Sequence, residues 1–257
     1  MALHSLLTAL RHPEKADGGP SLTRRLLLKP RVFDLVSCLI QLRDLRAVGR
    51  IRAGLPREEF YAKVADYNAG VTERKAVTTT RRAEIYYQIL AVPPRDLSGE
   101  RLLIVGPRNV HELFIAWLHG YRWKHIEAID LYSTNSKIRV MNMEAMTFAD
   151  DTFDAVVMAN TLAYSQDTFR CLSEVARVLK PSGRFVFGAT YFPQSRDWPG
   201  NRVSGNDIRQ MLKKLSLSIV FYTAFDKTNS LGGLQTAHIF GTQKIDPASP
   251  GFDRIDW

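Results

Sequence analysis

The sequence predicts an α/β protein in which a helical extension precedes a doubly wound sheet, mostly parallel, with an antiparallel last strand. Beyond residue 95, short apolar runs alternate with helical patterns, as in parallel sheets whose strands are joined by crossover helices. The last two apolar runs are joined by residues 224–235, which show no helical pattern. Parallel strands need a crossover, so this connection favours an antiparallel pair at the edge of the sheet.

The expected elements follow from apolar periodicity and from breaker residues. Strands are expected at residues 102–105, 125–130, 138–141, 153–159, 184–188, 217–223 and 236–243, and helices at 109–118, 165–179 and 205–215. Earlier helices are expected at 31–47, 57–69 and 80–91, the last ended by Pro93 and Pro94. We therefore expect a helical extension over residues 1–95 and a sheet domain over residues 96–257.

Composition narrows the function classes. The chain has 257 residues, of which 45% are hydrophobic, so it can bury a core. No apolar run reaches the roughly 18 residues that cross a bilayer, and the start lacks the basic region of a signal peptide, so we expect a cytoplasmic protein. Cys38 and Cys171 belong to no C-x-x-C pair or His cluster, and no metal site is expected.

The basic excess is concentrated in one N-terminal stretch. The net charge is +9, and residues 21–52 hold eight Lys or Arg against two acidic residues. In the helix expected there, apolar Val32, Leu35, Val36, Leu39 and Leu42 share one side, and polar Asp34, Ser37, Gln41 and Asp44 the other. We expect residues 22–47 to attach the protein peripherally to an anionic membrane surface, although the same apolar side would equally pack on the domain or form a homodimer. Nucleic acid is a weaker candidate, because aromatic residues are not interleaved with the cations.

Polar residues follow successive strands, at the end of the sheet where ligands bind in open α/β folds. Gly106 follows the first strand and allows a ligand to approach closely, and Asn109 is placed to cap the next helix, whose free amides attract anions. Asp130 ends the second strand, 24 residues after Gly106, which suits an acid that binds ribose hydroxyls. Asn142 and Asn160 follow the third and fourth strands. The ordered set predicts a crevice for a ligand that carries adenine and ribose.

Two segments make this prediction specific. NMEAMTFADDTFDAVVMANTLAY (142–164) and LSEVARVLKPSGRFVFG (172–188) resemble the "lPF.D.sFD.V" segment and the "E..RVLKPGG" turn of class I S-adenosylmethionine-dependent methyltransferases. The resemblance is strongest over residues 101–194 and extends weakly over about 100–243. It implies a Rossmann-like fold and S-adenosylmethionine as the cofactor.

The resemblance also implies a cofactor site at the ends of four strands. The methionine part would lie against Gly106, Pro107, Arg108 and Asn109, the ribose against Asp130 and Leu131, the adenine against Asn142 and Met143, and the floor would include Asn160. The first loop departs from the family pattern, with Ile104 in place of an acid and Pro107 to Val110 in place of glycines. It resembles a branch whose loop reads G-P-R-N-x-x-E, in which Glu112 would face the ligand's amine. The alternative is an inactive fold that serves as a binding or scaffold protein.

The acceptor side offers catalytic candidates but no unambiguous base. Tyr164, Tyr191 and Trp198 follow the fourth and fifth strands, and His111 lies in the first turn after the cofactor loop. Tyrosines of the N-terminal helices either close over the site or pack against the sheet: Tyr61, Tyr67, Tyr86 and Tyr87. The predicted function is methyl transfer to a small-molecule acceptor, such as a saccharide or lipid intermediate. A nicotinamide oxidoreductase would need G-x-G-x-x-G, which the sequence lacks.

Overall fold

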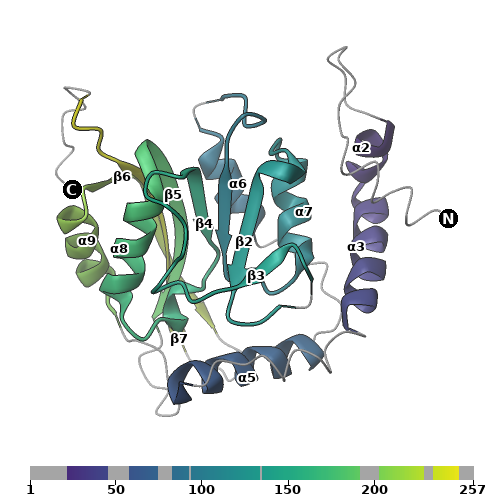
Figure 1. Ribbon diagram of the computed structural model, residues 1–257, viewed down its shortest axis with the longest axis horizontal. Coiled ribbons are helices and arrows are strands. Elements are labelled where there is room, and N and C mark those ends of the chain that lie inside the picture. Colours follow the sequence, from purple (N-terminus) through teal and green to yellow (C-terminus); the bar gives the residue numbers. More distant parts are fainter. Residues whose placement is uncertain are drawn as a thin grey trace.

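A seven-stranded sheet flanked by helices forms the body of the protein (Figure 1). The computed structural model describes residues 22–45, 58–74, 83–92, 94–133, 135–191, 203–228 and 234–248. The strands are β1 (Leu102–Val105), β2 (Ile126–Asp130), β3 (Ile138–Val140), β4 (Phe153–Met158), β5 (Leu179–Tyr191), β6 (Leu217–Thr228) and β7 (Leu234–Lys244). Each overlaps a strand that the sequence predicts.

The strand order is β3-β2-β1-β4-β5-β7-β6. The first five of these strands are mutually parallel, and β7 runs antiparallel to both β5 and β6. The expected sheet, mostly parallel with an antiparallel last strand, is confirmed. The order reverses at β1, which lies between β2 and β4, so the carboxyl ends of β1 and β4 form the switch point at which such sheets bind ligands.

Helices cover both faces of the sheet. α6 (Glu84–Leu90) and α7 (Val110–Leu118) pack on one face, and α8 (Thr168–Val178) and α9 (Gly205–Lys214) pack on the other. Outside α7 lie α2 (Leu22–Leu27) and α3 (Pro30–Leu45). α5 (Glu59–Arg74) crosses the end of the sheet where the parallel strands finish (Figure 1). Within the described residues, the connections include the short 3-10 helices η2 (Trp123–His125) and η3 (Leu162–Tyr164). The division of the chain into a helical extension and a sheet domain at residue 95 stays a prediction. α6, which precedes this boundary, belongs to the same hydrophobic core as β1, which follows it.

β5 is longer than the sequence predicts. The expected helix over 165–179 is the shorter α8, and β5 begins at Leu179, whereas the sequence predicts a strand only from Arg184. Leu179 pairs with Phe153 and Arg184 pairs with Ala155, so residues 180–183 bulge out of the ladder between the two pairs. Ser182 there has a positive φ of 60°. The Lys-Pro-Ser-Gly segment therefore ends the helix as expected, but it does so as a bulge within a strand.

The exposed side of α3 is also unexpected. Leu35, Leu39 and Leu42 face solvent, whereas Phe33 and Ile40 are buried against the domain. Of the expected apolar side, Val32 and Val36 therefore pack on the domain, whereas the three leucines do not. The buried side includes polar residues that the periodicity assigns to the surface: Ser37, Gln41 and Asp44. Hydrophobicity alone cannot reveal this arrangement, because polar side chains are buried readily when they find hydrogen-bond partners.

An aromatic stack joins β5 to β7 in the core. The ring of Phe187 lies 4.5 Å from that of Phe185 and 5.0 Å from that of Phe240, both nearly parallel to it. All three side chains are fully buried. The stack therefore fixes the antiparallel strand to the parallel part of the sheet.

We expect Phe187→Ala to lower the free energy of unfolding by about 3–5 kcal/mol, because it removes buried area and leaves a cavity. Denaturant titration followed by circular dichroism measures the change. The matched control is Phe169→Ala on α8, where the side chain is 40% exposed and the expected change is within about 0.5 kcal/mol. Equal losses in the two variants would contradict the prediction.

Candidate active site

The loop after β1 brings the chain close to β4. Gly106 has a φ of +71°, and a Cβ at this position would lie 2.2 Å from Cγ2 of Thr161, which follows β4. The Thr161 hydroxyl donates a hydrogen bond to the Gly106 carbonyl at 3.3 Å. Asn109 then caps α7, as expected, because its side-chain oxygen accepts a hydrogen bond from the His111 amide at 3.0 Å. The geometry requires glycine at position 106 and directs α7 at the switch point.

Two carboxylates lie at this switch point. Glu112 is in the first turn of α7, and Asp130 is the last residue of β2. Burial raises the pKa of each carboxyl to about 7, and the charge of Glu112 adds to the shift at Asp130. Arg108 acts in the opposite direction on both carboxyls, and its backbone amide donates to Glu112. The crevice therefore holds two acids and one cation within electrostatic reach of each other.

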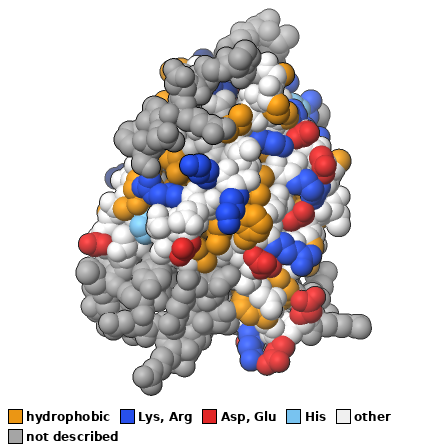
Figure 2. Space-filling model, turned by 90° about the vertical axis from the view of Figure 1, so that its left-hand side faces the viewer, with side chains coloured by type: hydrophobic (Ala, Val, Ile, Leu, Met, Phe, Trp, Pro, Cys, Tyr) orange, Lys and Arg blue, Asp and Glu red, His pale blue; other side chains and the backbone are white. Residues whose placement is uncertain are grey.

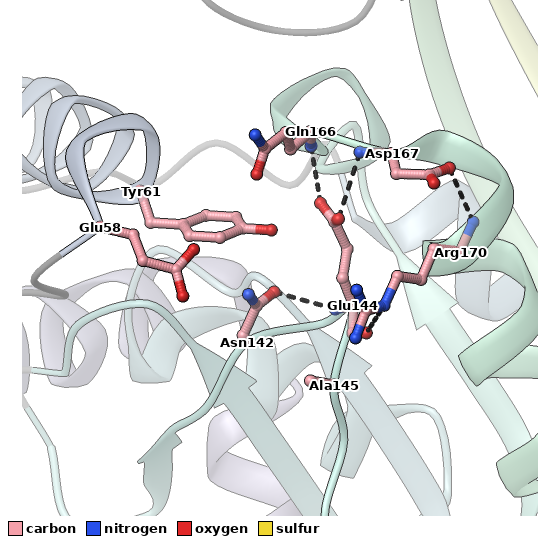
Figure 3. A pocket seen from close by; sticks show the side chains of 8 residues that line it. All are labelled: Glu58, Tyr61, Asn142, Glu144, Ala145, Gln166, Asp167 and Arg170. Atoms are coloured by element: carbon pink, nitrogen blue, oxygen red, sulfur yellow. Dashed lines mark hydrogen bonds between the residues drawn. The ribbon is translucent and has the colours of Figure 1, made fainter.

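A pocket of about 390 Å³ lies beside the carboxyl end of β3 (Figure 3). Its walls come from α5, from the loop after β3 and from the start of α8. Tyr61 of α5 points its ring across the pocket toward Asn142 and Glu144. Asn142, half-buried, accepts a hydrogen bond from the Glu144 amide at 2.9 Å. α5 therefore forms part of the site as well as covering the end of the sheet.

Comparison with known proteins assigns this architecture. A family model described as "Methyltransferase domain" matches residues 121–187. The ubiquinone/menaquinone biosynthesis C-methyltransferase of Rickettsia prowazekii is 28% identical over 143 residues, which cover 56% of this chain and 52% of that protein. The corresponding protein of Geobacter sulfurreducens is 40% identical over 65 residues, or 25% of each chain. The chain thus spans about half the length, or less, of these curated relatives.

Solved structures share the fold at low sequence identity. A phosphoethanolamine N-methyltransferase of Haemonchus contortus superposes with a TM-score of 0.56 and 13% identity, covering 75% of this chain and 61% of that one. A geranyl diphosphate C-methyltransferase of Streptomyces coelicolor superposes with a TM-score of 0.52 and 16% identity. The match covers 78% of this chain and 88% of that one. This chain has the class I S-adenosylmethionine-dependent methyltransferase fold. Both of those methyltransferases were solved with S-adenosylhomocysteine bound.

The residues of this crevice fit S-adenosylmethionine, the cofactor of the superfamily whose fold the chain shares. The cofactor carries a sulfonium, an ammonium and a ribose diol, all of which favour carboxylate partners, and a carboxylate, which favours a cation. Glu112 and Asp130 supply the carboxylates, and Arg108 supplies the cation. The departures of the first loop from the family pattern therefore leave a donor set of matching charge.

The other residues that the sequence predicts for the site divide into two groups. Burial raises the pKa of Tyr164 to about 12, with the neighbouring Tyr67 and Asp130 adding to the shift, so its hydroxyl lies at the crevice and stays neutral. His111 instead packs its ring 5.2 Å from that of Phe33, buried between α7 and α3. The side chain of Tyr191, and Trp198 with most of loop 190–204, lie outside the described residues.

α6 contributes a polar cluster beside the switch point. The Tyr86 hydroxyl accepts a hydrogen bond from Nδ2 of Asn160 at 3.0 Å, and Oδ1 of Asn160 accepts one from Thr190 at 3.4 Å. A Cβ at Gly188 would lie 2.2 Å from the Tyr86 hydroxyl, so this glycine makes room for the tyrosine. Of the four N-terminal tyrosines, Tyr61 lines the pocket beside β3 and Tyr67 lies within electrostatic reach of Tyr164, while Tyr86 and Tyr87 are buried against the sheet.

Sequence reasoning missed one structural acid of the site. The Glu144 side chain, on a residue 4% exposed, accepts hydrogen bonds from the amides of Gln166 at 2.6 Å and Asp167 at 3.1 Å. Its carbonyl accepts a further bond from Nε of Arg170 at 2.9 Å. Glu144 therefore fixes the loop after β3 to the start of α8. Its position two residues after Asn142 is the one signal in the sequence.

No group of His, Cys, Asp and Glu among the described residues could hold a metal ion. No helix among the same residues is long and apolar enough to cross a membrane.

We expect Asp130→Asn to stabilise the fold at pH 8 by about 1–2 kcal/mol, and by much less at pH 4.5. An unfolded aspartate titrates near pH ~3.9, whereas folded Asp130 keeps its proton up to about pH 7. The stability contributed by this carboxyl is therefore present at low pH and is lost as the pH rises through about 7.

Denaturant unfolding of both proteins at the two pH values tests this expectation. Asp96→Asn is the matched control, because that exposed carboxylate has a pKa lowered by hydrogen bonds from Ser98, and its replacement should give no gain at pH 8. An Asp130→Asn variant no more stable than the wild type at pH 8 would contradict the assignment.

Proposed function

We propose that the protein is an S-adenosylmethionine-dependent methyltransferase whose acceptor is a small molecule of the lipid-intermediate class. One observation carries the proposal: two half-buried carboxylates, Glu112 and Asp130, share the switch point of a methyltransferase fold with Arg108. Burying acidic groups without a full counter-charge costs free energy, and such sites are commonly functional.

The proposed cofactor contacts follow the order of the strands along the sheet. Arg108 and Glu112 bind the carboxylate and ammonium of the methionine part, along the backbone of Gly106 to Asn109. Asp130, followed by Leu131, accepts hydrogen bonds from the ribose diol. Asn142 and the Met143 amide hold the adenine, in the pocket that Tyr61 closes, and Asn160 lies on the floor. The support is the placement of these residues at the carboxyl ends of β1 to β4.

The bound cofactor would supply an electrophilic methyl group on a sulfonium. The protein's part is to hold the acceptor in line with that methyl group and to exclude water. Tyr164 and Tyr86, with pKa values raised to about 12, are neutral at physiological pH and therefore serve as hydrogen-bond donors that orient the acceptor rather than as bases. His111 faces α3 and is the weaker catalytic candidate, while Tyr191 remains a candidate on β5.

A lipidic acceptor is favoured over a saccharide by the names of similar proteins. The curated relatives are C-methyltransferases of ubiquinone and menaquinone biosynthesis, and one structural neighbour acts on geranyl diphosphate. Both names point to acceptors with apolar bodies, for which carbon is the proposed methylated atom. Peripheral attachment to an anionic membrane through residues 22–47 belongs to the same proposal, and a homodimer stays a prediction.

The second candidate is an inactive fold that serves as a binding or scaffold protein. The observation in its favour is the first loop, where Pro107 provides no amide donor and Ile104 replaces the family's acid. The two candidates differ in one measurable property, the affinity for the cofactor.

Calorimetric titration with S-adenosylmethionine and S-adenosylhomocysteine separates them. We expect binding by the wild type and a loss of about 30-fold or more for Asp130→Ala, because two charge-assisted hydrogen bonds disappear, worth about 2 kcal/mol together. Asp96→Ala, which removes an exposed carboxylate that precedes β1 and so lies at the end of the strand opposite the crevice, should bind as the wild type does. No binding of either ligand at millimolar concentration would establish the inactive alternative. Glu112→Ala with wild-type affinity would remove only the role of Glu112.

The affinity should depend on pH. Because the pKa values of Glu112 and Asp130 are about 7 in the free protein, both carboxyls gain protons as the pH falls from 8 to 6. A protonated carboxyl loses its attraction for the ligand's ammonium and its full capacity to accept hydrogen bonds. We expect the affinity for S-adenosylhomocysteine to fall about tenfold over this range, as expected for one group with a pKa near 7. Affinity that is constant from pH 6 to 8 would contradict the carboxylate contacts.

A further inference from the structure

α3 buries polar side chains and exposes leucines, which is the reverse of the usual amphipathic arrangement. One side of the helix buries Ser37, Gln41 and Asp44 together with Phe33 and Ile40. The other side exposes leucines: Leu35 is 61% exposed, Leu39 45% and Leu42 47%. A helix that merely covered the domain would turn its leucines inward, since burial of a leucine is worth about 1.5–3 kcal/mol. The arrangement needs one reason for the buried polar side and another for the exposed apolar side.

The buried polar side holds the loops of the cofactor crevice. Oε1 of Gln41 accepts a hydrogen bond from Nδ2 of Asn109, the residue that caps α7, at 3.0 Å. Oδ2 of Asp44 accepts one from Nδ2 of Asn135, in the loop after β2, at 2.7 Å. Arg43 pairs with the same carboxylate at 3.0 Å. α3 is thus fixed in orientation by the loops that follow β1 and β2.

The exposed side is apolar along its middle and cationic at its ends. Leu35, Leu39 and Leu42 lie at helical spacings of four and three residues, so they form one stripe on α3. Leu26 of α2 and Leu28 of the turn after it are exposed as well. We call Leu35, Leu39 and Leu42 the leucine stripe. The exposed charged residues beside it are cations: Arg25, Lys29, Arg31 and Arg43. Of the two acids of α3, Asp44 is buried in its ion pair and Asp34 is only half-buried.

We propose that the leucine stripe and its flanking cations are a docking surface for an anionic lipid bilayer. An apolar helical face bordered by Lys and Arg enters the interface of a bilayer and attracts acidic headgroups. A second copy of the chain is a poorer occupant, because an antiparallel pair of α3 helices would set Arg25, Lys29 and Arg31 of one copy against Arg43 of the other. Like charges in contact disfavour such an interface.

The opposite side of the molecule has a different charge pattern. Figure 2 shows that side, where Lys and Arg alternate with Asp and Glu among scattered apolar side chains. On the α3 side, by contrast, the exposed leucines share one stripe and the exposed charged residues of α2, α3 and the turn between them are cations. Docking there would orient the protein with the loops after β1 and β2 directly behind the membrane-bound helix. This inference rests on the proposed function, because an enzyme with a lipidic acceptor would meet that acceptor at a bilayer.

Co-sedimentation of the full chain with vesicles tests the surface. The vesicles are phosphatidylcholine with one quarter phosphatidylglycerol, and pure phosphatidylcholine. We expect the wild type to bind the anionic vesicles at low salt and to lose binding as salt is added. Leu35→Gln/Leu39→Gln/Leu42→Gln should bind at least tenfold more weakly. Val140→Gln/Phe169→Gln/Val220→Gln, three exposed apolar residues on β3, α8 and β6, is the matched control and should bind as the wild type does.

Two further measurements make every outcome decisive. Arg25→Gln/Lys29→Gln/Arg31→Gln should weaken binding to anionic vesicles without the leucine changes, which keeps the test valid if the leucine variant does not fold. Calorimetry with S-adenosylhomocysteine should give wild-type affinity for both variants, so loss of docking is distinguished from failure of the proposed function. The proposal is overturned if the wild type does not bind anionic vesicles, or if the leucine variant and the cation variant both bind them as strongly as the wild type does. It is also overturned if light scattering shows a wild-type dimer that the leucine changes dissociate, since the occupant is then a second copy.

Discussion

Keeping Glu112 and Asp130 ionised side by side in a half-buried crevice costs free energy, and much of the surrounding structure serves to hold them there. Their pKa values of about 7 express that cost, because each carboxyl keeps a proton well above its ordinary range. Only Arg108 and a few backbone amides oppose the cost among the described residues of the free protein. A cationic ligand whose hydroxyl groups donate hydrogen bonds to these carboxylates would reduce this cost. The site therefore gives up stability of the free fold for affinity toward its ligand.

The walls of the crevice come from elements on every side of the sheet. α5 closes the end of the strands through Tyr61 and Tyr67, and Glu144 fixes the loop after β3 to the start of α8. α3 holds the opposite side, because Gln41 and Asp44 accept hydrogen bonds from Asn109 and Asn135 in the loops after β1 and β2. The N-terminal helices are consequently part of the site, although the sequence motifs of the methyltransferase family begin only near residue 101.

The sequence predicts what depends on local pattern and misses what depends on partners. The apolar run at 102–105 predicts a strand and β1 is Leu102–Val105, because four apolar residues between Arg101 and Gly106 are too few for a helix and favour a buried strand. β5 is longer than expected since the ladder resumes across the bulge at 180–183. The side of α3 that is buried could not be foreseen, because Gln41 and Asp44 find their partners about 70 and 90 residues away along the chain. The roles of Glu144 and of the Tyr86–Gly188 contact escape sequence reasoning for the same reason.

The altered first loop can be understood from these contacts. Glycines allow a loop to approach a ligand and to donate its amides, and this loop retains one such position, Gly106, where Thr161 leaves no room for a side chain. Pro107 gives up an amide, whereas the amide of Arg108 is directed at the carboxylate of Glu112. The charged side chains of Arg108 and Glu112 thus replace the acid on β1 and the glycine-rich loop that are usual in the family. A loop of this kind has fewer backbone donors but a stronger preference for a ligand that carries both a cation and an anion. That preference matches the methionine part of S-adenosylmethionine. The altered loop is therefore explained more simply as a different way of binding the cofactor than as a loss of cofactor binding.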